Sequence, residues 1–393
     1  MFVRQSLRKL PSLMARRYTA TATEATASET IQPSLRDTLV PTDYRTNETN
    51  AAAHSNIHDA KFYTIPADVK KQIFGGGGLP KKYEQQLKTF TESTLMVRQP
   101  ALELINYIQN TDFTKPVVRY VLYGENGVGK TLTMAHVIHY GHQNGFLLVH
   151  VPWVANWMKR PKETANAAQE GFIDLPFDAA AWLLHFKNQN AKLLQTLDLK
   201  TTQEYVWSKR ESTPAGSTLL ELVEHGITRI KFASETITAL LAEIKQHACN
   251  NKCKVMVAID GFNAFYHPIT RILGDNKQII KPERITLTQP FLDITAYNWT
   301  NGVCILTVDK IAMTEGYMDS YMPRYLLGRK GFEHLDPFVP IHIENYNNKE
   351  FHSCIQYYLE RHWIQKTPEG FEDQLKYLSN KNPYELMRQT RAL

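Results

Sequence analysis

A glycine-rich segment between two apolar stretches constrains this chain more than any other part of its sequence. Residues Val117–Tyr123 are mostly β-branched or aromatic, which predicts a buried strand. After the segment, apolar residues from Leu132 to Ile138 recur at helical spacing. The segment itself, GENGVGKT, matches G-x-x-x-x-G-K-[ST] at each specified position, and strand, loop and helix in this order are the context that the pattern requires. The residues predicted to surround a phosphate are Gly124, Glu125, Asn126, Gly127, Val128, Gly129, Lys130, Thr131 and Leu132.

The residue types in this segment suit the binding of phosphate groups. Its glycines allow a tight loop whose backbone N–H groups turn inward, and the following helix adds the positive end of its dipole. Lys130 can reach the β- and γ-phosphates of a nucleotide, and the Thr131 hydroxyl can bind Mg²⁺. The alternative is an ordinary glycine-rich turn, which the complete motif and its two flanks disfavour. We therefore predict that the chain binds a nucleoside triphosphate or diphosphate.

A second apolar run, Val255–Ile259, ends in Asp260 and predicts another buried strand. An aspartate at the carboxyl end of a parallel strand beside the phosphate loop can hold Mg²⁺, so Thr131 and Asp260 form the predicted metal site. Gly261 follows, where many ATPases place a second acid that orients the attacking water. Hydrolysis is therefore in doubt, and no catalytic residue is assigned. Thr307 or Asp309, after a further strand, could approach the γ-phosphate, although a cap of the strand end is the favoured role.

The N-terminal residues resemble a mitochondrial targeting sequence. Residues 1–23 contain no acid, and their basic residues are Arg4, Arg8, Lys9, Arg16 and Arg17. An arginine-rich, acid-free and roughly amphipathic segment is typical of a transit peptide. The alternative is a basic tail that binds anions. Because this segment supplies five of the six net positive charges, overall basicity does not argue for nucleic-acid binding.

The composition divides the chain into five parts. We predict a transit peptide over residues 1–18 and a disordered or extended arm over 19–60, which is rich in Thr, Ala, Ser, Glu and Asn. Residues 61–98 contain the tract Gly75–Gly78 between lysines and are predicted to be a flexible linker. The nucleotide-binding domain covers 99–345 and a C-terminal helical lobe covers 346–393.

The remaining patterns predict an α/β fold. Further strands are expected at Phe146–Val151, Gly302–Thr307 and Pro340–Ile343, with mostly helical sequence from Trp157 to about Asn250. Residues 205–213 are expected to form an anchored loop. No apolar run is long enough to span a membrane, so we do not expect a membrane among the partners. The four cysteines are too few and too scattered for a disulfide framework and are predicted to be reduced thiols.

Several separate blocks of the sequence resemble one known family. They include YGENGVGKTLTMAHVIHY, YVWSKRESTPAGS, VAIDGFNA and LDPFVPIHIENYNNKEFHSCIQYYLE. Together they look like the P-loop protein of the mitochondrial small ribosomal subunit, the death-associated protein three family. The resemblance runs from about Pro116 to the C-terminus.

This resemblance implies an AAA-like P-loop NTPase fold of the signal-transduction type, in which helices cover both faces of a parallel sheet and a helical lobe follows. It implies that Gly124 to Thr131 bind phosphates, that Asp260 lies on the metal side, and that Asn382 and Pro383 lie beside the base. It also implies a guanine nucleotide, GTP or GDP, with Mg²⁺. The implied partners are small-subunit ribosomal RNA and neighbouring ribosomal proteins in the mitochondrial matrix.

The residues alone do not indicate whether the bound base is guanine or adenine. The Asn-Lys pairs beginning at Asn251, Asn276, Asn348 and Asn380 all lack the Asp of the N-K-x-D motif that reads guanine in other GTPases, so ATP stays open. The favoured hypothesis is a structural component of the mitochondrial ribosome that holds a nucleotide with little or no hydrolysis. The alternative is an active P-loop NTPase or switch of the matrix with a regulatory role, for which a link to apoptosis stays open.

Overall fold

A computed structural model describes residues 43–267, 269–274, 277–313 and 320–391. Its centre is a five-stranded sheet in which all neighbouring strands are parallel. In spatial order the strands are β11 (Val339–His342), β3 (Val118–Tyr123), β10 (Gly302–Thr307), β9 (Val255–Ile259) and β4 (Leu147–Val151). Each strand predicted from an apolar run is present, with its ends shifted by at most one residue.

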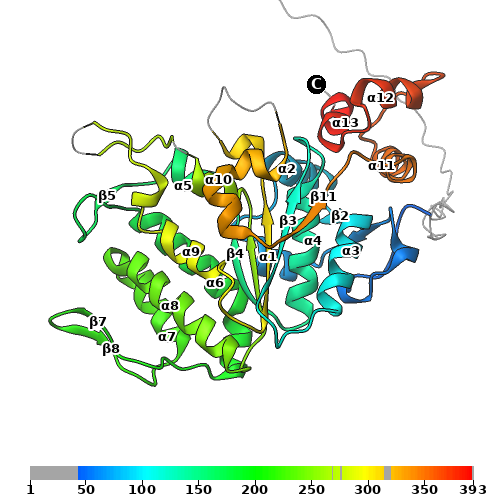
Figure 1. Cartoon of the computed structure of the whole chain (residues 1–393). Coiled ribbons are helices and arrows are strands. Elements are labelled where there is room, and N and C mark those ends of the chain that lie inside the picture. Colours follow the sequence, from blue (N-terminus) through cyan, green and yellow to red (C-terminus); the bar gives the residue numbers. More distant parts are fainter. Residues whose placement is uncertain (1–42, 268, 275–276, 314–319, 392–393) are drawn as a thin grey trace, which may run out of the picture. The chain divides into compact units, whose positions relative to one another are not determined.

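The strands read as continuous apolar runs because both faces of the sheet are buried. On β3, Val121 faces one core while its neighbours Tyr120 and Leu122 face the other. The first of these cores packs against the helices from α5 (Ala155–Lys159) to α10 (Pro323–Leu335). The second packs against the helices from α1 (Ala67–Phe74) to α4 (Lys130–Gln143) (Figure 1). The predicted α/β fold, with a parallel sheet and helices on both of its faces, is therefore present.

The helices on the sheet face that borders the second core include α3 (Gln99–Gln109) and α4 (Lys130–Gln143). The helices of the other face are α5 (Ala155–Lys159), α6 (Pro176–Leu197), α7 (Leu219–Thr228), α8 (Ala233–Cys249), α9 (Thr288–Ile294) and α10 (Pro323–Leu335). Two small hairpins, β5 (Ala165–Asn166) with β6 (Ile173–Asp174) and β7 (Tyr205–Ser208) with β8 (Glu211–Thr213), lie outside the main sheet. The β7–β8 hairpin occupies the segment for which we expected a loop, and it is anchored by the Tyr205 hydroxyl on Glu243.

The segment 61–98 differs from the flexible linker that its glycines and lysines predicted. It contains β1 (Phe62–Thr64), α1 (Ala67–Phe74), α2 (Lys81–Phe90) and β2 (Thr94–Met96). The glycine tract allows close packing: a Cβ at Gly76 would lie 2.4 Å from Nδ1 of His185, and one at Gly78 would lie 2.5 Å from Cε1 of His150. Glycine therefore serves here to let the backbone approach buried side chains.

The second half of the predicted disordered arm is also folded. Within residues 43–60, Ala51 and Ala60 are fully buried. Nδ1 of His54 lies 2.8 Å from Nε2 of His136 in α4. The low content of large apolar residues was misleading because small alanines and a histidine make these contacts. The predicted transit peptide and residues 19–42 lie outside the described residues.

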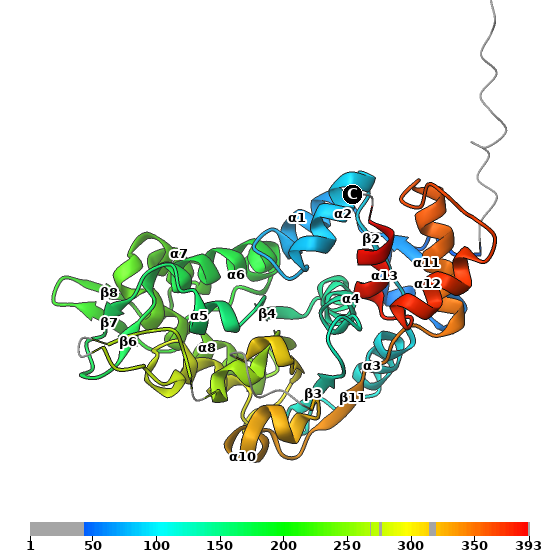
Figure 2. The ribbon, with the colours of Figure 1, turned by 90° about the horizontal axis from the view of Figure 1, so that it is seen from above.

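The C-terminal lobe consists of α11 (Asn348–Glu360), α12 (Phe371–Ser379) and α13 (Pro383–Thr390). Its apolar residues share a third core with Phe62 of β1 and Phe90 of α2, and the ring of Phe62 stacks on Tyr357 with centroids 4.3 Å apart. Figure 2 shows α13 beside α2. Segments from the two ends of the described chain therefore pack together next to the loop that leads into α4.

Candidate functional site

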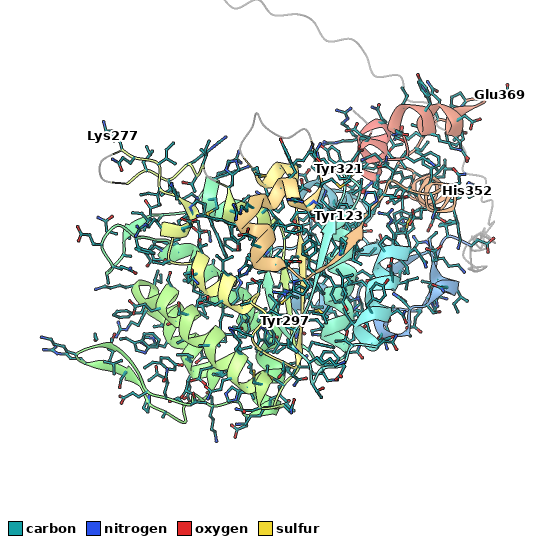
Figure 3. All side chains as sticks on the ribbon, in the orientation of Figure 1. Tyr123, Lys277, Tyr297, Tyr321, His352 and Glu369 are labelled. Carbon is teal, nitrogen blue, oxygen red and sulfur yellow. The ribbon has the colours of Figure 1, made fainter. Side chains whose placement is uncertain are left out.

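The glycine-rich loop joins β3 to α4 at the carboxyl end of the sheet. Tyr123, which ends β3, stacks on His342 of β11 with centroids 4.9 Å apart, and His342 in turn stacks on Tyr321 (Figure 3). All three motif glycines have positive φ angles, 148° at Gly124, 83° at Gly127 and 100° at Gly129. This backbone conformation strains any residue with a side chain, which explains why the loop requires glycine at these positions.

The carbonyl groups of this loop are all occupied. Those of Gly124 and Glu125 accept hydrogen bonds from Lys130 Nζ, and that of Gly129 accepts one from the Thr133 amide. The other three accept bonds from more distant parts of the chain: Asn126 from Asn382, Gly127 from the Tyr384 amide and Val128 from Arg98. The loop therefore has no carbonyl left to repel an anion.

The N–H groups of the same loop show the opposite pattern. Within the described part of the chain, none of the backbone N–H groups from 125 to 132 donates a hydrogen bond to a protein acceptor. Successive free N–H groups in a loop of this conformation, at the N-terminus of a helix, form an anion-binding concavity. The loop is thus fixed through its carbonyls and leaves its donors for a ligand.

Lys130 is buried at the start of α4. Its ammonium group donates to the carbonyls of Gly124 (3.0 Å) and Glu125 (2.7 Å), and it forms an ion pair with Asp309 Oδ2 at 2.9 Å. Asp309 follows β10, so the sheet brings a carboxylate to the lysine from a distant part of the sequence. Asp309 was predicted mainly to cap the strand end, and its pairing with Lys130 was not predicted.

Asp260 lies between two hydroxyl groups at the carboxyl end of β9. Thr131 donates to its Oδ2 at 2.7 Å, and Thr307 donates to its Oδ1 and accepts from the Gly261 amide. Burial raises the pKa of the Asp260 carboxyl to about 6, although the two hydroxyl bonds and Lys130 favour the charged form. The structure thus brings together Thr131 and Asp260, the two residues predicted for the metal.

Gly261 could not be replaced by an acid without rearrangement. Its φ angle is 73°, and a Cβ at this position would lie 2.9 Å from Cζ3 of Trp153. The side chain of a second acid would therefore meet an indole ring.

Replacement of Gly261 by alanine is expected to destabilise the protein by about 1–3 kcal/mol, because it adds both backbone strain and a clash with Trp153. Urea unfolding of the purified protein measures this loss. Gly145→Ala is the matched control, since Gly145 has a φ angle of 69° but nothing within 4 Å of its Cβ position. Equal losses in the two variants would show that Trp153 does not restrict position 261.

Asn382 and Pro383, predicted to lie beside the base, are at the start of α13. The Asn382 amide donates to the Asn126 carbonyl at 2.9 Å, and its Oδ1 caps α13 by accepting from the Tyr384 and Glu385 amides. Asn382 therefore contacts the glycine-rich loop directly. Pro383 lines a cavity of about 40 Å³ together with Gly129, Leu132 and Thr133 of the loop and α4.

A larger cavity, of about 340 Å³, lies between α2 and α13. Its walls include Lys82, Gln86, Trp363, Tyr384, Met387 and Arg388. Gln86 of α2 lines both cavities. The side of the glycine-rich loop that faces these cavities is thus bordered by α2, a helix in the segment predicted to be a flexible linker.

Arg98 is the main site residue that sequence reasoning missed. Its guanidinium donates to the carbonyls of Val128 (2.6 Å) and Glu344 (3.0 Å), pairs with Glu350 of α11 at 2.9 Å, and lies over the ring of Tyr346. Arg98 therefore connects the phosphate loop to the C-terminal lobe. A single arginine thirty positions before its partner carries no sequence signal of this role.

The described residues contain no cluster of three or more His, Cys, Asp or Glu side chains that could hold a metal ion by themselves. Thr131 and Asp260 would therefore hold Mg²⁺ only together with phosphate oxygens, which is the usual arrangement for this ion. The four cysteines are free, as predicted. No helix among the described residues has the length and apolar character needed to cross a membrane.

The fold and the site define an α/β protein whose parallel five-stranded sheet presents a glycine-rich loop and an aspartate at its carboxyl end. Residues 95–389 match the family described as mitochondrial ribosomal death-associated protein 3. The chain belongs to this family, which confirms the resemblance found in its sequence and the predicted location at the ribosome of the mitochondrial matrix.

Two curated relatives are similar over most of their length. Small ribosomal subunit protein mS29 of Bos taurus is 40% identical over 357 residues, which cover 88% of this chain and 89% of the relative. The protein of the same name from Mus musculus is 39% identical over 349 residues, or 88% of each chain. Among solved structures, the Aeropyrum pernix ORC2 protein is 14% identical with a TM-score of 0.32, over 74% of this chain and 58% of that one.

Proposed function

We propose that this protein is a structural component of the mitochondrial small ribosomal subunit that holds a guanine nucleotide and Mg²⁺ at its glycine-rich loop, with little or no hydrolysis. The structural role is supported by the names of the relatives, both of which are small-subunit ribosomal proteins. The observation that carries the nucleotide site is the loop itself. Its carbonyls are all bonded, while its N–H groups from 125 to 132 donate to no acceptor among the residues that the structure describes.

The residues fit a nucleotide in their chemistry as well as in their arrangement. Free N–H groups and the start of α4 suit the α- and β-phosphates, and Lys130 supplies the cation. The order of the strands, with β10 between β3 and β9, supports an AAA-like P-loop fold of the signal-transduction type. Thr131 and Asp260 would hold Mg²⁺, which would neutralise phosphate charge.

The pKa of Asp260 gives a testable consequence for stability. Since burial raises this pKa from 3.8 to about 6, the folded protein takes up a proton between pH 6 and 4 while the unfolded chain stays ionised. The carboxylate therefore lowers stability above pH 6, and this penalty is relieved as the pH falls. Without nucleotide, Asp260→Asn is expected to be more stable than the wild type at pH 8, by up to about 3 kcal/mol, with the difference vanishing near pH 4.

Adding Mg²⁺ and GDP at pH 8 should reverse this order, because only the wild type retains the metal-binding carboxylate. Thermal melting of both proteins at pH 8 and pH 5, with and without Mg²⁺-GDP, measures both effects. If Mg²⁺ increased the stabilisation by GDP equally in the two proteins, Asp260 would not be a metal ligand.

Low hydrolysis is supported by the surroundings of Asp260. Gly261 occupies the position of the second acid, and its contact with Trp153 leaves no room for a carboxylate there. The complete set of Lys130, Thr131 and Asp260 is what the alternative function, an active matrix NTPase or switch, would also use. A turnover assay separates the two functions, since sustained release of phosphate would favour the switch.

Guanine as the base rests on the family resemblance, and adenine remains the competing outcome. Asn382 and Pro383 border the loop on the side where α2 and α13 enclose the two cavities, which supports a base-side position for them. Contacts with ribosomal RNA and neighbouring ribosomal proteins are proposed on the same family grounds. The proposed import signal is the basic N-terminal segment.

The test of this function is sedimentation of mitochondrial lysate at high salt, followed by extraction of nucleotide from the fraction that contains this protein. We expect the protein to travel with the small subunit and to carry one GDP or GTP per chain. A protein that stays in light fractions and turns over added triphosphate would be a matrix NTPase instead. Recovery of ATP or ADP from the subunit fraction would overturn only the choice of base.

A further inference from the structure

We infer that Asp309 makes this site select nucleoside diphosphate over triphosphate. The inference rests on the proposed nucleotide function and concerns which form of the nucleotide is retained. Asp309 Oδ2 and Lys130 Nζ form an ion pair and lie 2.9 Å apart. A protein carboxylate thus binds the ammonium group that contacts a γ-phosphate in other P-loop proteins.

Asp309 is held in place by both its side chain and its backbone. Its Oδ1 accepts from the Ile311 amide at 2.9 Å and caps the short helix Lys310–Ala312. Its backbone N–H donates to Asn263 Oδ1 (3.0 Å) and its carbonyl accepts from Asn263 Nδ2 (2.9 Å). The carboxylate therefore cannot move away from Lys130 without breaking this cap or the strand end of β10.

The ammonium group of Lys130 has no spare proton. It has three N–H donors, and the three acceptors are the carbonyls of Gly124 and Glu125 and the carboxylate of Asp309. A β-phosphate would also be held by the free loop amides, so it depends less on the lysine. A γ-phosphate depends on the lysine more, and it would have to displace a fixed carboxylate of like charge.

Among the described residues, the other charged groups around this position do not compensate for Asp309. Asp260, which contacts Thr131 and Thr307, is a second carboxyl group close enough to interact electrostatically with both Lys130 and Asp309. Arg98 is paired with Glu350 and bonded to the Val128 carbonyl, and Lys159 donates to the carbonyls of Ile311 and Met313. A single Mg²⁺ would balance the phosphates of a diphosphate better than the additional charge of a triphosphate.

The test is a titration of the purified full-length protein with GDP and with GTP in the presence of Mg²⁺. The wild type is expected to bind GDP at least about tenfold more tightly than GTP, since like charges this close are strongly unfavourable. Asp309→Asn keeps the shape and the acceptor for Ile311 but removes the charge. This variant should raise the affinity for GTP at least about tenfold and change the affinity for GDP by less than about threefold.

Asp309→Ser, which can still cap the Ile311 amide, is the second variant in case the asparagine protein does not fold, and it should shift the preference in the same direction. Asp112→Asn, at an exposed turn before β3, is the control and should leave both affinities unchanged. If the wild type bound GTP as tightly as GDP and the Asp309 variants kept that ratio, the inference would fall while the nucleotide site stood. If the wild type bound neither nucleotide, the proposed function itself would fail.

Discussion

Lys130→Ala is expected to lower the affinity for GDP and GTP by about 10- to 100-fold. The phosphates would lose their main cationic partner, and a hydrogen bond to a charged group contributes about 1.5–3 kcal/mol. The purified variant should therefore carry no nucleotide, as measured by extraction and chromatography. If the nucleotide supports docking on the ribosome, the variant should also enter the small subunit poorly in cells that depend on it.

The variant needs a control for the fold, because Lys130 also bonds two carbonyls of the loop and Asp309. The double variant Lys130→Ala, Asp309→Asn removes the uncompensated carboxylate and should recover stability but not nucleotide binding. Lys115→Ala, which changes an exposed lysine just before β3, should behave like the wild type. Unchanged nucleotide content in purified Lys130→Ala protein would refute the site.

Sequence predicted those parts of the site that depend on neighbouring residues. The loop before α4 needs glycine at three positions with positive φ, and Lys130 and Thr131 follow directly at the start of the helix. Asp260 was found because a buried parallel strand reads as an apolar run whose end is marked by a polar residue. The sheet then brought Thr131 and Asp260 within hydrogen-bond distance.

Contacts between segments that are distant in the sequence could not be predicted from local patterns. Residues 61–98 look like a linker by composition, yet Phe62 and Phe90 form a core with α11 and α13 that neither segment could form alone. The tract Gly75–Gly78 has the composition of a flexible spacer, whereas in the structure it fits against His185 and His150. Sequence alone does not distinguish a glycine that allows close packing from a glycine that makes the backbone flexible.

Arg98 illustrates the same limit and gives the largest expected effect on stability. Arg98 and Glu350 are both buried, and their side chains are 8% and 2% exposed. Removing one partner of such a pair leaves a buried charge without compensation, so Arg98→Ala is expected to destabilise the protein by about 3–5 kcal/mol. The loss should appear as a lower midpoint of urea unfolding. Because Arg98 also holds the Val128 carbonyl, nucleotide affinity should fall as well.

Two comparisons separate the charge of Arg98 from its packing. Arg98→Met keeps most of the apolar stem but leaves Glu350 unpaired, so it should be nearly as unstable as the alanine variant. Combining Arg98→Met with Glu350→Gln removes both charges and should recover much of the loss, since neutral replacement of a buried pair is tolerated far better than removal of one partner. Arg329→Ala, in an exposed pair with Glu333, should change stability by less than about 1 kcal/mol. If Arg98→Ala lost no more than Arg329→Ala, the buried pair would not hold the C-terminal lobe against the phosphate loop.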